Sequence, residues 1–343
     1  MANRTYSLIA AGILALAFPS AHADDKAALT ARLQTVEAAT ALDGQSVKPW
    51  HLKLNVQLYD NKGKPSEQGD IEEWWAGPDQ YLVAYTFPTY TGKMLHTAAG
   101  EFRTQGIGVP PMMIAKLLDQ VVHPMPRAAE VASSEPVLRK QTVGTIPLDC
   151  IMLSQPLKDV PTPPLGLFPS YCLDPVKDML LATYDLGSVA TVQNSVGLFQ
   201  KLTVATNVSI NIGPMKLADA KVTALGGMKP DAAQFAKADG FEPVEKPVSV
   251  PQDWMNDQGL VKFPPVYPNE AKSKHMDGAV VFHAVIGRDG LVRELQLKSA
   301  ADPSLALSAF FTVRQWTYKP PAPNGKPVDV ESTIRVNFQY RGK

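Results

Sequence analysis

Apolar and polar residues alternate without a break from Trp50 to Leu58. A period of two places alternate side chains on opposite faces of a strand, so this segment predicts a strand with one buried face. Leu202 to Ile212 repeats the pattern and predicts a second such strand. Shorter strands are predicted where β-forming residues stand between turn signals. They cover Gly69–Trp75, Gln80–Phe87, Lys93–Phe102, Ile146–Leu153, Met179–Leu186 and, as a closing strand, Leu217–Leu225.

Helical spacing of apolar residues occurs twice before residue 240. Leu29, Leu33 and Val36 share one face of a predicted helix between Asp24 and Ala41. A second helix is predicted from Pro110 to Val122, because two prolines open it and a His-Pro pair follows it. The pattern therefore places a few helices among many antiparallel strands.

The last eighty residues show a different order of elements. Gly278 to Ile286 alternates, an Arg-Asp-Gly turn follows, and Leu291 to Lys298 returns as the second strand of a hairpin. Asp302 stands before a proline, which predicts a capped helix start. A final strand is predicted from Val328 to Tyr340. This order predicts a small ββαβ unit with one helix across a three-stranded sheet.

A proline-containing stretch without periodicity, Phe241 to Gln252, separates these two patterns. It predicts a linker between a mainly β domain at 24–240 and a C-terminal domain at 253–343. The fold class that follows is α+β, with a mainly antiparallel N-terminal domain and a small C-terminal domain.

The first 23 residues have the order of a secretory signal peptide. A basic residue precedes an apolar core of about 13 residues, whereas a membrane-spanning helix needs roughly 20. Ala21-His22-Ala23 forms a small-x-small cleavage motif. We therefore expect cleavage after Ala23 and a periplasmic protein, with an uncleaved inner-membrane anchor as the alternative.

Charge and cysteine content narrow the functional classes. Lys plus Arg and Asp plus Glu both total 33, and no basic run exists that could neutralise a phosphate backbone, which argues against nucleic acid as a partner. The two cysteines, Cys150 and Cys172, predict one disulfide in an oxidising compartment, with two buried thiols as the alternative.

Several short motifs in the last eighty residues resemble the TonB C-terminal family. They are Pro265-x-Tyr267-Pro268-x-x-Ala271, Gly278-x-Val280, Asp289-Gly290-x-Val292, Val313-Arg314-x-Trp316-x-Tyr318-x-Pro320, Gly325-x-Pro327-Val328 and Val336-x-Phe338. They occur in the family's order, over about residues 263–341. The resemblance implies a domain that receives a short peptide from an outer-membrane TonB-dependent receptor or another envelope protein.

Strand addition at an exposed sheet edge is the physical mode we expect for such docking. The final strand is the predicted edge, with a proline-flanked tyrosine at the entry. The candidate protein-binding residues are Pro265, Tyr267, Pro268, Arg335, Val336, Asn337, Phe338, Gln339 and Tyr340. For the aromatic residues the simpler alternative is a core position. Pro264 departs from the family pattern, and neither a membrane anchor nor a long proline-rich spacer is evident, which argues against strict force transduction.

The N-terminal order of a leading helix, antiparallel strands and an inserted helix resembles the open half-barrel of LolA-type lipoprotein carriers. That resemblance implies a concave apolar surface for a lipid, a lipoprotein or another apolar ligand. Candidate ligand-binding residues, each of which could equally be an ordinary core residue, are Trp74, Trp75, Met112, Met113, Leu117 and Leu118. Of the two tryptophans, alternation turns one inward and one outward.

Catalysis finds no support in the sequence. The six histidines are scattered, nucleophile elbows and phosphate-binding fingerprints are incomplete or missing, and Glu72 and Glu73 are neighbours on a strand that must face opposite sides. We therefore expect no enzyme activity, no metal and no cofactor. The predicted function is an exported protein that docks a partner in envelope transport or TonB-linked uptake, and the alternative is a periplasmic carrier or sensor.

Overall fold

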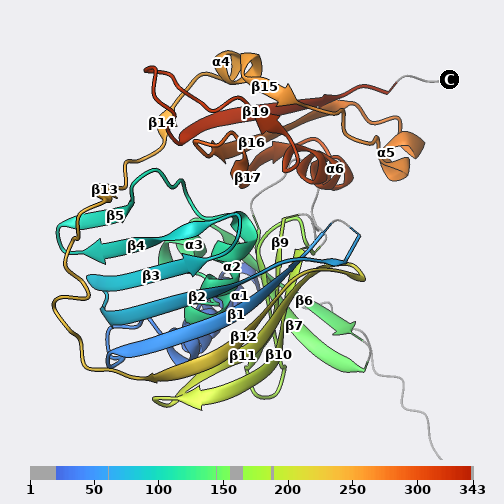
Figure 1. Ribbon diagram of the computed structural model, residues 1–343. Helices are drawn as coiled ribbons and strands as arrows, with labels where there is room; N and C mark the ends of the chain where they lie inside the picture. The colour runs from blue at the N-terminus through green and yellow to red at the C-terminus, as the bar shows by residue number, and fades with distance from the viewer. Residues whose placement is uncertain (1–20, 61, 144, 155–164, 187–188, 341–343) are drawn as a thin grey trace, which may run out of the picture.

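Two large β-sheets dominate the described architecture, with the C-terminal sheet above the larger N-terminal one in Figure 1. The computed structural model describes residues 21–340, apart from residues 61, 144, 155–164 and 187–188. The predicted signal peptide up to residue 20, and most of the proline-rich loop between the cysteines, lie outside the described residues. The α+β fold class predicted from the sequence is confirmed.

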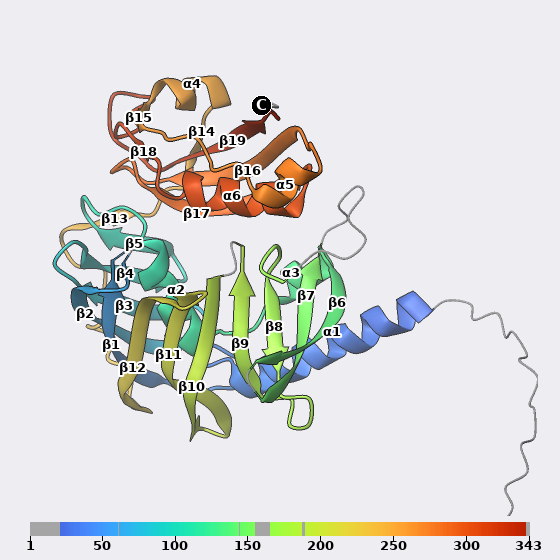
Figure 2. The same cartoon turned by 90° about the vertical axis from the view of Figure 1, so that its right-hand side faces the viewer.

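The N-terminal sheet has 13 antiparallel strands. The strands are β1 (Trp50–Tyr59), β2 (Pro65–Gly77), β3 (Gln80–Thr86), β4 (Thr91–Thr97), β5 (Gly100–Thr104), β6 (Glu135–Val143), β7 (Ile146–Ser154), β8 (Ser170–Leu173), β9 (Leu180–Asp185), β10 (Val189–Phe199), β11 (Leu202–Ile212), β12 (Met215–Gly227) and β13 (Phe241–Pro243). Their order is β13-β5-β4-β3-β2-β1-β12-β11-β10-β9-β8-β7-β6, and the sheet curves without closing (Figure 2).

The alternation in β1 is the clearest sequence prediction that the structure confirms. Trp50, Leu52 and Leu54 are fully buried, whereas the polar residues between them are half-buried. β1 pairs with β2 on one side and with β12 on the other, and so joins the early strands to the late ones. This pairing places the residues of both halves of the sheet in one core.

Several strand predictions need correction. Lys93–Phe102 is two strands, β4 and β5, because the chain turns between Thr97 and Gly100, where Gly100 has a positive φ of 125°. The predicted closing strand, Leu217–Leu225, belongs to β12 in the interior of the sheet, and the edges are β13 and β6. Strands β6, β8 and β10 were not predicted because their apolar positions do not alternate cleanly.

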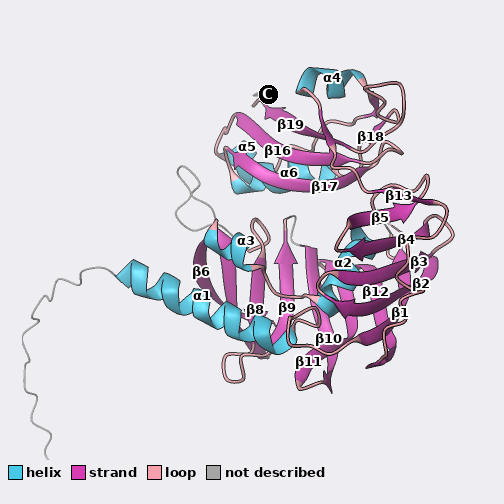
Figure 3. Cartoon of the chain, turned by 90° about the vertical axis from the view of Figure 1, so that its left-hand side faces the viewer, coloured by secondary structure: helices cyan, strands magenta, loops and turns pink. Residues whose placement is uncertain are grey.

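Three helices lie against one face of the curved sheet: α1 (Ala21–Thr40), α2 (Met112–Val122) and α3 (Ala128–Ala132) (Figure 3). Both longer helices were predicted. Leu33 and Val36 of α1 pack on a cluster formed by α3 and strands β7 to β9. Because α2 also buries its apolar face, the concavity predicted from the LolA resemblance is largely filled by the protein's own helices.

The predicted disulfide between Cys150 and Cys172 is present and joins the adjacent strands β7 and β8. Both residues are completely buried, and their Cα atoms are 3.9 Å apart.

The C-terminal domain carries a four-stranded sheet in the order β14-β19-β16-β17 and a separate pair, β15 and β18. Its elements are β14 (Val248–Ser249), α4 (Gln252–Asp257), β15 (Gly259–Val261), α5 (Asn269–Ser273), β16 (Gly278–Ile286), β17 (Val292–Ala300), α6 (Pro303–Val313), β18 (Thr317–Tyr318) and β19 (Val330–Phe338). The predicted order strand, strand, helix, strand is present as β16, β17, α6 and β19.

Two local predictions in this domain have a direct physical basis in the structure. The carboxylate of Asp302 accepts a hydrogen bond from the backbone N–H of Ser304 at 2.8 Å, so it caps α6 as expected. Gly290 closes the β16–β17 turn with a φ of 80°, and a Cβ atom there would clash with the carbonyl oxygen of Tyr318. Only glycine fits this turn without strain.

The sheet has one strand more than predicted, because residues 241–252 are not a free connection. Their first part forms β13 beside β5, and their later part forms β14, which pairs in parallel with Val330 and Glu331 at the start of β19. Strands of two or three residues have no readable period, so the sequence could not predict them.

Candidate functional site

The outer edge of β19 is the candidate docking site. β16 covers the other side of β19 along its whole length in one uninterrupted register. On the outer side, Val248 and Val250 donate their N–H groups to the carbonyls of Asp329 and Glu331, at 2.9 and 3.0 Å. Odd-numbered residues of β19 therefore direct their backbone groups outward, because this direction alternates along a strand.

Beyond Glu331 this outer edge has no strand partner in the described part of the chain. By the same alternation, Thr333, Arg335 and Asn337 present unpaired N–H and C=O groups there. The prediction of an edge from Val328 to Tyr340 is thus too long, since β14 covers its beginning. The available edge runs from Thr333 to Asn337.

The predicted site residues divide into two groups by exposure. Arg335, Asn337 and Gln339 are exposed, and the Arg335 Nε atom donates a hydrogen bond to the side-chain oxygen of Asn337 at 3.1 Å. Val336 and Phe338 are buried in the core of the domain, although Phe338 also lines the groove at the end of the edge.

A shallow groove lies at the end of this edge. It is lined by Pro264, Pro265, Tyr267, Asn337, Phe338 and Gln339. The Tyr267 ring meets Phe338 edge to face, with centroids 5.8 Å apart, and its hydroxyl donates to the carbonyl of Met276. The structure therefore brings Pro265 and Tyr267 together with the final strand, as predicted, and adds Pro264.

Two predicted docking residues lie beside the groove. Pro268 precedes α5 as its N-cap residue. Tyr340 donates its N–H to the carboxylate of Asp277, and its ring contacts His275 at a centroid distance of 4.4 Å. Both residues fix the segments that bound the groove.

A buried ion-pair network connects the start of β19 to the N-terminal domain. The Arg103 guanidinium, on β5, lies 2.7 Å from the carboxylate of Asp329, the residue that precedes β19, and both side chains are at most 3% exposed. The other oxygen of Asp329 accepts the backbone N–H of Arg288, whose guanidinium pairs with Glu242 at 2.8 Å. These residues are up to 226 positions apart, so no local signal in the sequence could reveal their contact.

The predicted ligand-binding residues do not form one surface. Met112 and Met113 line a cavity between the two domains. Leu117 and Trp75 are buried in the core, where Trp75 stacks on Trp50 at 5.8 Å, and Leu118 packs against the same core. Trp74 points to the opposite face, as alternation predicts, and stacks on His51 at 5.1 Å.

Glu72 and Glu73 face opposite sides of β2, as predicted. Glu72 lies 2.7 Å from the Nε2 atom of His51. Glu73 is 4% exposed on the core face, and burial together with the nearby carboxylates of Asp43 and Asp119 raises its pKa to about 8. Burial disfavours the charged form, so this carboxyl group is mostly neutral at pH 7.

Within the described residues, no cluster of three His, Cys, Asp or Glu side chains is arranged as a metal site. None of the helices described combines the length and apolarity needed to cross a bilayer.

Comparison with known proteins gives one family-model match and several solved structures that are similar to parts of the chain. Residues 264–340 match the family model described as the Gram-negative bacterial TonB protein C-terminal. The TonB C-terminal domain of Pseudomonas aeruginosa covers 25% of this chain and 87% of its own, at 24% identity and a TM-score of 0.22. The family-model match confirms the predicted resemblance to the TonB C-terminal family over this region.

The solved structures similar to the N-terminal part include a LolA-superfamily protein of Nitrosomonas europaea, which covers 60% of this chain and 97% of its own, at 10% identity and a TM-score of 0.40. A putative outer-membrane lipoprotein-sorting protein domain of Vibrio parahaemolyticus covers 61% and 97%, at 10% identity and a TM-score of 0.42. No curated protein matches the chain.

Proposed function

We propose that the protein works in the bacterial envelope as a non-catalytic docking protein, and that its TonB-like domain binds an extended peptide by strand addition to β19. The observation that carries this proposal is the unpaired edge from Thr333 to Asn337. An edge of this kind offers backbone donors and acceptors in the spacing of a β-ladder. Export to the periplasm, which the first 23 residues predict, would bring the edge to envelope partners.

The geometry limits the length and affinity of the peptide. Five residues of edge followed by the groove at Gln339 correspond to about seven residues of extended peptide, at roughly 3.3 Å per residue. Each net hydrogen bond contributes about 1 kcal/mol, and one apolar side chain in the groove adds roughly 2 kcal/mol. The three outward residues offer six backbone groups, so the sum is about 8 kcal/mol. The entropic cost of association removes at least about 4 kcal/mol of it, so we expect a weak complex with a dissociation constant on the order of 1 mM.

The partner class follows from the site and the matched family together. A flexible, periplasm-facing segment of an outer-membrane TonB-dependent receptor has the required extended form. Side-chain specificity is expected at the groove, where Pro264, Pro265 and Tyr267 accept an apolar residue. Docking to such a segment places the protein in envelope transport or TonB-linked uptake.

Two substitutions of Arg335 separate backbone pairing from side-chain contact. Arg335→Pro removes one outward N–H group, which a sheet edge tolerates, whereas Arg335→Ala keeps that group and removes the same side chain. With heptapeptides from receptor N-termini, isothermal titration is expected to show at least fivefold weaker binding for Arg335→Pro than for Arg335→Ala. Equal affinity of the two variants, with the fold intact by circular dichroism, contradicts strand addition.

A further inference from the structure

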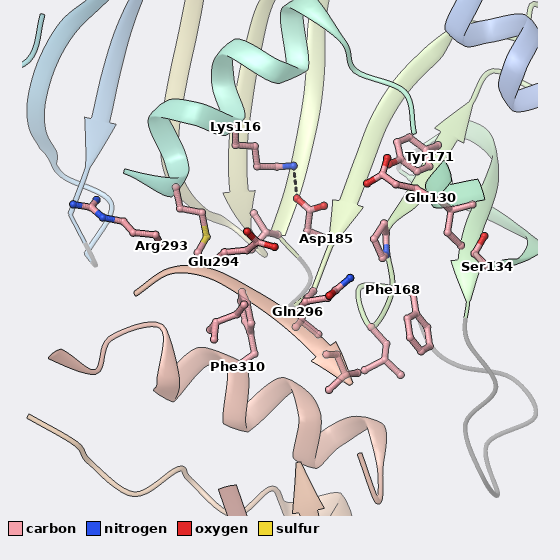
Figure 4. A pocket seen from close by; sticks show the side chains of 18 of the residues that line it. Lys116, Glu130, Ser134, Phe168, Tyr171, Asp185, Arg293, Glu294, Gln296 and Phe310 are labelled. Carbon is pink, nitrogen blue, oxygen red and sulfur yellow. Dashed lines mark ion pairs between the residues drawn. The ribbon is translucent and has the colours of Figure 1, made fainter. Parts of the chain in front are cut away.

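The cavity between the two domains has walls from both of them (Figure 4). The N-terminal domain contributes α2, α3 and the ends of strands β7 to β10, and the C-terminal domain contributes β17 and α6. The cavity volume is about 330 Å³, which lies in the range of small-molecule sites. β17 is the edge strand at the far end of the C-terminal sheet from β14 and β19. Residues 293–297 of β17 therefore line the cavity without involving the outer edge of β19.

Most of the cavity lining is apolar. The side chains that define it are Met112, Phe168, Leu186, Val189, Leu297 and Phe310. Methionine side chains adapt to the shape of an occupant, and aliphatic and aromatic walls favour an alkyl or aryl chain over a polar molecule.

The polar groups of the cavity carry an excess of negative charge. Lys116 is neutralised by its ion pair with Asp185, which Figure 4 shows at the centre of the cavity. The guanidinium of Arg293 points away and pairs with Asp289. Glu130 and Glu294 then line the cavity without a cationic partner among the described residues. Glu130 accepts only the backbone N–H of Arg127, at 2.7 Å.

We propose that this cavity binds a small cationic amphiphile, with an alkyl or aryl chain against the apolar walls and an amine beside Glu294, while Glu130 lies on the other side of the Lys116–Asp185 pair (Figure 4). Glu130 and Glu294 are both exposed to solvent, so water screens their charge in part, but an anionic head group would still meet two carboxylates and be weakly repelled. The ligand class is thereby distinguished from a fatty acid, and the site is distinct from the docking edge of β19.

The ion pairs between the described residues of the two domains lie away from the cavity. In the described residues, the ion pairs between the domains and their connection are those of Arg103, Asp329, Arg288 and Glu242 at the β5 corner. No hydrogen bond or ion pair between described residues of the two domains crosses the cavity itself. Around the cavity the two domains instead meet through apolar side chains, because Phe168, Leu297 and Phe310 belong to one core cluster.

Three probes with the same chain length test the ligand class on the full mature protein. Dodecylamine, dodecanol and dodecanoate are titrated below their micellar concentrations at pH 7, and binding is followed by calorimetry and native mass spectrometry. The expected result is saturable 1:1 binding of dodecylamine, about tenfold tighter than dodecanoate, which corresponds to the difference between attraction and repulsion at a partly exposed carboxylate. No saturable binding of dodecylamine, or equal affinity for all three probes, overturns the proposal.

One substitution from each domain tests whether both form the site. Glu294→Gln removes a carboxylate from β17, and Met112→Lys adds a cation from α2. Each is expected to weaken dodecylamine at least fivefold and to reduce its preference over dodecanoate, whereas Lys298→Gln, on β17 but outside the cavity, leaves both unchanged. Unchanged dodecylamine binding in Glu294→Gln shows that the C-terminal domain is not a wall of the site and overturns the proposal, while peptide docking at β19 is unaffected by this result.

Discussion

Replacement of Asp329 by asparagine removes one charge from the buried pair that joins the docking strand to the N-terminal domain. The remaining Arg103 guanidinium is 2% exposed, and its next partner, Glu242, lies at 3.4 Å and is 30% exposed. Loss of one member of a buried ion pair costs about 3 to 5 kcal/mol, because the other charge stays buried without full compensation. Because Glu242 compensates in part, we expect about 3 kcal/mol for Asp329→Asn.

A double-mutant cycle measures this coupling. The variants are Asp329→Asn, Arg103→Met and the combination, each followed by urea unfolding at pH 7. Since Arg103→Met alone leaves a buried carboxylate, both single variants should be strongly destabilised, whereas the double variant should lose less than the sum by at least 2 kcal/mol. Strictly additive losses, or a loss below about 1 kcal/mol for Asp329→Asn, refute the view that this pair fixes the docking strand to the N-terminal domain.

Three further predictions concern stability. Glu73 has an ordinary pKa of 4.5 and a folded-state pKa of about 8. The protein is therefore more stable below about pH 4.5, where Glu73 is neutral in both states, and about 5 kcal/mol of stability is lost as pH rises to about 8 and the buried carboxyl group must ionise. Glu73→Gln should flatten this dependence in urea unfolding, and an unchanged slope contradicts the raised pKa. Reduction of the Cys150–Cys172 disulfide, which spans 22 residues, should lower stability by about 3 kcal/mol, and an unchanged unfolding midpoint in the Cys150→Ser/Cys172→Ser double variant would count against it. Asp302→Ala should cost about 1 kcal/mol through the lost cap of α6, with Asp302→Asn retaining most of the stability in the same thermal scan, and equal melting temperatures for the two variants would exclude a capping role.

The parts of the fold that the sequence predicts are those with a local physical signal. The alternation from Trp50 to Leu58 identifies β1 and its buried face, and the Asp-Gly and Asp-Pro pairs locate the last hairpin and the start of α6. The spacing of the C-terminal motifs identifies the TonB-like domain. In each case, neighbouring residues determine the local conformation, so a single sequence is sufficient.

The parts that the sequence does not predict depend on contacts between distant segments. β14 contains only Val248 and Ser249, and it pairs with the start of β19 and so shortens the unpaired edge. Two residues are too few to show a hydrophobic period, so the sequence does not predict this pairing. The approach of Arg103 to Asp329 requires both domains to be in place. The cavity between the domains also depends on distant segments. Met112 and Met113 of α2 line it only because β17 and α6 lie opposite them.

Hydrogen exchange at β19 tests the central claim most directly. The outward amides of Thr333, Arg335 and Asn337 have no strand partner among the described residues, whereas those of Ile334 and Val336 already pair with β16. A receptor-derived heptapeptide at saturating concentration should slow exchange at the three outward amides by at least tenfold and leave the other two unchanged, since only the outer edge gains partners. Binding of the peptide without protection at Thr333, Arg335 and Asn337 would contradict docking by strand addition.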